Sequence, residues 1–215
     1  ANMSLLLKNT RKSVVVQFAQ HHDLIYFHKV DPDGTEVPVI RGSTVSPGQH
    51  DQHCCIGTHA EYDMVLIERT SKVESQPYTS KPTKWYVLQI DLKTAKNLPY
   101  TFIGTKQQDK AFYASILHSH RDARYLSIPT TSPHVSAFTS RYAVLASPAV
   151  TQYVHELLSD DIVDSMAAHK YPFAIEIEQD SIIVITNAKK PNQQLLDKLL
   201  HFGLWFAKML DKKFN

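Results

Sequence analysis

The chain has 215 residues, of which 43% are hydrophobic. By size scaling, a chain of this length buries roughly 70% of the surface that its unfolded form exposes. Its 23 basic and 21 acidic residues leave a formal net charge of +2, so bulk electrostatics give no reason to expect nucleic acid or an anionic membrane as the main partner.

The two cysteines, Cys54 and Cys55, are adjacent and cannot build a disulfide framework, since vicinal pairs bridge only with strained geometry. They favour a reducing, intracellular setting. No run approaches the roughly 18 apolar residues of a membrane span, and no charged segment leads an apolar one at the start. We therefore expect a cytoplasmic chain, which a longer gene product could tether to the membrane through an upstream anchor.

The first third of the chain predicts a helix and then a hairpin. Residues 9–21 place apolar side chains on one side and basic and amide side chains elsewhere, which indicates an amphipathic helix with His21 or His22 on its apolar side. A strand over 24–30 and a return strand over 36–41 flank a turn rich in proline and glycine. Residues 42–57 are predicted to form a polar loop.

The middle of the chain is typical of strands. Residues 60–71 and 84–92 are predicted to be the arms of a long antiparallel hairpin, because both runs are rich in β-branched and aromatic residues. A short strand over 100–104, a helical or irregular segment over 109–117 and a strand over 123–127 follow.

The organisation is clearest between residues 138 and 186. A strand over 142–146 precedes a helical unit that opens at Pro148. Two alternating runs, 173–178 and 181–186, then predict a third hairpin.

The chain ends in a long helical pattern after Pro191, with a broad apolar stripe that must be buried against a sheet or a partner. The stripe comprises Leu195, Leu196, Leu199, Leu200, Gly203, Leu204, Phe206, Ala207 and Leu210. Strands and helices without regular alternation predict an α+β fold, with amphipathic N- and C-terminal helices packed on a mostly antiparallel sheet. We expect one domain over 1–215, or two sub-domains that meet near 128–137.

Residues 50–61 contain three histidines, both cysteines and two carboxylates, which are ligand types for zinc. His53, Cys54 and His59 would form a three-ligand metal site if the turn at Gly57 brought them together. A structural zinc site pairs two short-spaced ligands with two more distant ones, and no second Cys/His pair occurs elsewhere at that spacing. The alternative interpretation is a polar loop whose cysteines pack as small apolar groups.

Two other polar groups have structural interpretations beside functional ones. The run His118-Ser119-His120 suggests a hydrolase, but residues adjacent in sequence need not reach one another as nucleophile and base. Asp160 and Asp161 could bind a divalent cation, yet they also suit the first turn of a helix.

Five short stretches carry a family resemblance: PVIRG at 38–42, YVLQIDL at 86–92, NLPYTFIG at 97–104, FTSRYAV at 138–144 and ASP at 146–148. With the order of elements around them, they resemble an uncharacterised conserved bacterial domain of unknown function. That domain is common in small-genome candidate-phyla bacteria, often behind membrane spans. The resemblance implies a fold and brings no activity and no catalytic residues.

We expect a non-catalytic binding or scaffolding module without a cofactor, acting on an unknown protein partner or in a membrane-anchored context. A metal-dependent hydrolase using the 50–61 cluster, with help from His118 or His120, is one alternative. A peripheral membrane-associated domain that docks through the terminal helix, with Trp205 beside its lysines, is the other. The first hypothesis predicts a buried terminal stripe and scattered histidines, whereas the second predicts convergence of the ligands to within about 4 Å.

Overall fold

The computed structural model describes residues 14–29, 50–71, 83–94, 96–108, 110–128, 132–188 and 191–215. The strands are β1 (Ile25–Lys29), β2 (His50–His59), β3 (Tyr62–Ser71), β4 (Thr83–Asp91), β5 (Leu98–Thr105), β6 (Arg124–Leu126), β7 (Tyr142–Ala146), β8 (Ala174–Gln179) and β9 (Ser181–Asn187). The helices are a first helix over 14–21, α2 (Lys110–Ser119), α3 (Val135–Arg141), α4 (Thr151–Leu157), α5 (Asp160–His169) and α6 (Gln193–Phe214), with a 3₁₀ turn η1 (Pro148–Val150).

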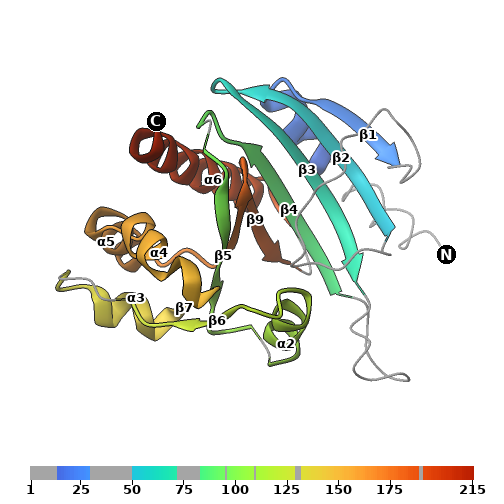
Figure 1. The fold of residues 1–215 in the computed structure, drawn as a ribbon. Helices are drawn as coiled ribbons and strands as arrows, with labels where there is room; N and C mark the ends of the chain where they lie inside the picture. Colours follow the sequence, from blue (N-terminus) through green and yellow to red (C-terminus); the bar gives the residue numbers. More distant parts are fainter. Residues whose placement is uncertain are drawn as a thin grey trace.

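These strands form one antiparallel sheet in the order β1-β2-β3-β4-β9-β8-β5-β7-β6 (Figure 1). The predicted α+β class is confirmed, including the helices at both ends of the chain. Strands from before and after residues 128–137 alternate in the sheet, because β9 pairs with β4 and β8 pairs with β5.

Most predicted elements agree with the observed ones. The first helix and β1 match the predicted helix and strand, and β3 with β4 forms the predicted long hairpin. The hairpin predicted over 173–186 is β8 with β9, and the terminal helix is α6. The predicted turn at 31–34 and return strand at 36–41 lie outside the described residues.

The loop predicted over 42–57 is wrong where the structure describes it, because His50–His59 is a strand paired on both sides. Strand pairing is made by the backbone, so the polar side chains of β2 do not prevent it. The register shifts between Gln52 and Cys55, and His53 has a φ of 53°. This bulge interrupts the two-residue alternation by which a strand is recognised in sequence.

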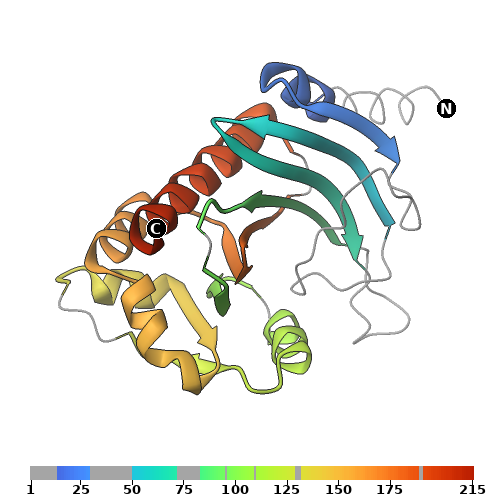
Figure 2. The same ribbon diagram turned by 45° about the horizontal axis from the view of Figure 1, so that its top comes forward.

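Most of the helices cover one face of the sheet, and α2 lies on the other (Figure 2). The first helix and α3, α4, α5 and α6 contribute to the larger core, whereas α2 contributes Tyr113 and Ile116 to the smaller one. The apolar stripe of α6 is buried apart from the half-buried Leu195, as the binding-module hypothesis expected. None of the helices in the described ranges is long and apolar enough to cross a membrane.

Candidate functional site

The structure does not bring His53, Cys54 and His59 together. All three lie on β2, where six residues at about 3.3 Å each would separate His53 from His59 by roughly 20 Å. His53 Nδ1 is 2.7 Å from Tyr26 Oη. Within the described part of the chain, no group of three or more His, Cys, Asp or Glu residues is arranged to hold a metal ion.

The two cysteines face opposite sides of the sheet. Cys54 is fully buried in the smaller core and Cys55 in the larger one. Burial raises the pKa of each thiol to about 12. Both thiols therefore stay protonated at neutral pH, whereas a metal ligand or nucleophile is the thiolate.

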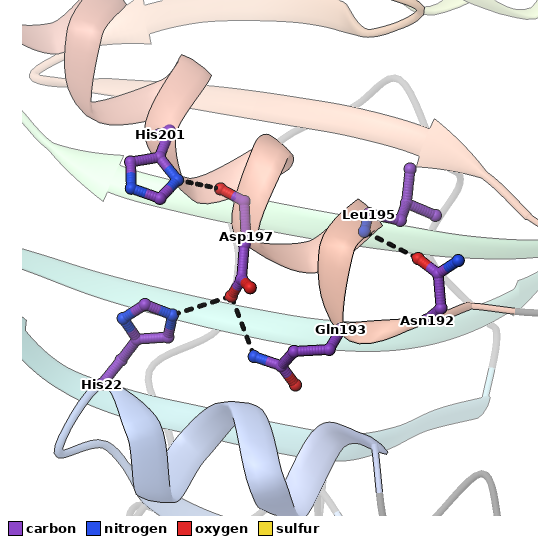
Figure 3. Close-up of polar contacts among 6 residues, drawn as sticks. All are labelled: His22, Asn192, Gln193, Leu195, Asp197 and His201. Carbon is purple, nitrogen blue, oxygen red and sulfur yellow. Dashed lines mark hydrogen bonds and ion pairs between the residues drawn. The ribbon is translucent and has the colours of Figure 1, made fainter.

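Histidines gather instead where the first helix meets α6. His22 Nε2 lies 3.0 Å from Asp197 Oδ1, and Gln193 Nε2 donates to the same oxygen at 2.8 Å (Figure 3). The ring centroid of His22 is 4.9 Å from that of His21 and 4.8 Å from that of His59. We call His21, His22, His59, Gln193 and Asp197 the histidine cluster.

The end of the first helix sets the position of His22. The amide of His22 donates to Phe18 O at 3.1 Å, and the amide of Leu24 donates back to Ala19 O at 2.8 Å. Asp23 has the left-handed φ of 55° that such an end requires. This Schellman arrangement ends the helix directly before His22 and sends the chain into β1.

The turn between β2 and β3 sets the position of His59. His59 pairs with Tyr62, and the two residues between them, Ala60 and Glu61, have φ of 49° and 68°. Positive φ at both central positions is typical of a type I′ hairpin turn, whose twist matches that of the strands. The turn therefore holds His59 at the end of β2, in contact with His22.

Asp197 is held by the first turns of α6. Asn192 caps the helix, because its side chain accepts a hydrogen bond from the amide of Leu195 at 2.8 Å. Gln193 and Asp197 are four residues apart and so lie on the same side of the helix. His201, one turn further on, has its Nδ1 at 2.6 Å from the backbone oxygen of Asp197.

Burial lowers the pKa of His22. The hydrogen bond and the charge of Asp197 oppose this effect, while the neighbouring His59 and His21 add to it. His22 is therefore neutral at neutral pH. Since an ionised carboxylate only accepts, the proton of the neutral ring lies on Nε2 and points to Asp197.

A neutral imidazole oriented by a carboxylate resembles half of a catalytic triad. Within the described residues, however, the side chain of His22 hydrogen bonds to Asp197, and its ring contacts are Phe18, His21 and His59. The arrangement joins two helices and a strand through groups that can take up protons. Its sequence signal was the pair of histidines ending an amphipathic helix, one of them on the apolar side.

The other predicted groups are dispersed. His118 and Ser119 end α2 and are exposed, while the ring of His120 stacks on Tyr100 with centroids 3.4 Å apart. Burial lowers the pKa of His120. Asp160 and Asp161 form the first turn of α5, as the structural interpretation predicted.

Trp205 packs within the protein rather than extending from α6. Its ring centroid is 5.7 Å from that of Phe202 and 6.3 Å from that of Tyr171. The helical stripe next to it is already buried against the sheet. The apolar face that a membrane-docking helix would insert is therefore occupied.

No protein-family model and no curated protein matches the chain. Among solved structures, the chain is similar to the crystal structure of the mycobacterial trehalose monomycolate transport factor A, TtfA. The two share 11% sequence identity and superpose with a TM-score of 0.60, over 94% of this chain and 92% of that one. At this identity the likeness shows a shared fold.

Proposed function

We propose that this protein is a non-catalytic binding or scaffolding module, acting as an accessory factor in transport. The observation that carries the proposal is the likeness of fold, over nearly the whole of both chains, to a protein described as a transport factor. The proposal extends the role of that neighbour to this chain on the likeness of fold.

The hydrogen bonds made by buried polar side chains support the same proposal. Four of these groups, His22, Glu68, Arg69 and Asp211, hydrogen bond to a side chain of another element, as a rigid scaffold requires. The pairs are His22 with Asp197, Tyr62 with Asp211, Tyr86 with Glu68, and Arg69 with Asp51.

We propose a protein partner in a membrane-associated context. Among the large apolar side chains in the described ranges, Ile25 on β1 and Tyr125 on β6 are exposed, at 64% and 58%. These strands end the described sheet at opposite edges. Both residues are therefore suitable positions at which to probe for a partner.

A photo-crosslinking amino acid at Ile25 or at Tyr125, in the full-length protein within its own cells, tests the proposal. The exposed polar residues Gln152 and Lys198 provide control positions. An adduct with one subunit of a transport system, formed from an apolar position and absent from both controls, is expected. The same adducts from all four positions would contradict the proposal.

Metal analysis separates this function from the hydrolase alternative. Elemental analysis of the untagged protein and of the His53→Ala variant measures zinc directly. Stoichiometric zinc in the wild type that is lost in the variant, together with hydrolysis of ester, phosphoester or peptide substrates, would overturn the non-catalytic proposal. Equal background metal and no turnover in either protein agree with it.

A further inference from the structure

We propose that the histidine cluster is a proton-sensitive clasp, which holds the first helix against α6 at neutral pH and releases it on acidification. The clasp joins the two ends of the described chain, since His22 and Asp197 are 175 residues apart. It is independent of which partner the protein binds.

The charges at this contact become unbalanced when protons are added. Its titratable groups, within the described residues, are His21 and His22 from the first helix, His59 from β2, and Asp197 and His201 from α6. Protonation places positive charge on rings whose centroids are 4.8 and 4.9 Å apart. Asp197 supplies a single negative charge, and the adjacent Gln193 is neutral, so like-charge repulsion is left uncompensated.

The direction of the effect follows from linkage. Burial holds the pKa of His22 below its ordinary value of 6.5, so the detached helix binds a proton more readily than the docked one. The contribution of His22 to docking is complete above that value. It is lost as the pH falls from 6.5 through the lower pKa of the docked state.

Release would uncover apolar surface. Val15, Phe18 and Ala19 of the first helix are each 1% exposed and belong to the larger core. Cys55 Sγ on β2 donates to Val15 O at 3.8 Å, which places β2 directly beneath the helix. Acidification would therefore expose one side of the helix and the core residues below it.

Hydrogen exchange of the full chain, measured by mass spectrometry at about pH 7.5 and about pH 5.5 and corrected for the intrinsic rate, tests the clasp. Peptides covering the first helix are expected to lose protection severalfold at the lower pH, while peptides of β4 and β9 stay protected. In His22→Gln, whose amide can still donate to Asp197 but does not titrate, this loss is expected to disappear. His118→Gln, on the exposed end of α2, is the matched control and should behave like the wild type.

Three results would overturn the proposal. They are equal protection of the first helix at both pH values, the same loss in His22→Gln as in the wild type, or a simultaneous loss in β4 that reveals global unfolding. Circular dichroism establishes whether His22→Gln is folded. If it is not, His59→Gln removes one neighbouring ring and should reduce the loss; an unchanged loss there would also overturn the clasp.

Discussion

Asp211 is a buried carboxylate that accepts several hydrogen bonds. It is 6% exposed, and it accepts hydrogen bonds from Tyr62 Oη at 2.7 Å and from the amides of Lys93 and Thr94 at 3.0 Å. An Asp211→Asn change replaces one acceptor oxygen by an NH₂ group facing donors. We expect the free energy of unfolding, measured in urea, to fall by about 2–3 kcal/mol.

The neighbouring residue supplies the control for this prediction. Lys212 lies in the same turn of α6 but is exposed. A Lys212→Gln variant should therefore stay within about 0.5 kcal/mol of the wild type. Similar losses in the two variants would mean that the hydrogen bonds of Asp211 are not the cause of the loss in Asp211→Asn.

Ala60 occupies a backbone conformation that suits glycine. Its φ of 49° lies in the left-handed region, which costs an ordinary L-residue about 1–2 kcal/mol. Ala60→Gly should raise the free energy of unfolding by about 0.5–1 kcal/mol, allowing for the added freedom of the unfolded chain. Ala60→Val should lower it, and thermal melts that rank valine above glycine would contradict the turn described for β2 and β3.

At the scale of elements, the approach of α6 to the sheet depends on Gly203. A Cβ atom there would lie 2.8 Å from Ile90 Cδ1 and 3.2 Å from Leu88 Cδ2. Gly203→Leu should overpack this interface and lower the free energy of unfolding by about 1–3 kcal/mol in urea denaturation. Gly203→Ala should cost less, because the gain in helix propensity of about 1 kcal/mol offsets small side-chain shifts.

An exposed position on the same helix controls for the added leucine. Lys198 faces solvent on α6, so Lys198→Leu should leave the free energy of unfolding nearly unchanged. If the two leucine variants lost stability equally, close packing at Gly203 would not be the cause.

At the scale of the whole molecule, the alternation of strands predicts a single cooperative unit. The chain contains two tryptophans, Trp85 on β4 and Trp205 on α6. Single-tryptophan variants Trp85→Phe and Trp205→Phe report on the two halves of the chain separately. We expect the fluorescence midpoint of each in urea to coincide with its own circular dichroism midpoint. Distinct fluorescence and circular dichroism midpoints within one variant would instead support two sub-domains meeting near 128–137.

Periodicity along the chain was sufficient to predict the α+β class, the hairpins β3–β4 and β8–β9, and the buried stripe of α6. In each of these elements the side chains repeat at the spacing of one secondary structure, and that spacing decides which side is buried. For these elements, the local spacing of side chains was therefore enough to predict the structure.

Only the tertiary structure decided where the polar residues lie and which residues they contact. β2 is a strand because β1 and β3 pair with its backbone from both sides, although its side chains and its bulge give no alternating pattern. The histidines of the predicted metal cluster are separated by the rise of that strand, and His59 meets His22 instead. The bond from His22 to Asp197 joins residues 175 positions apart. Contacts between residues so far apart in the sequence follow from how the elements pack. No local sequence pattern contains that information.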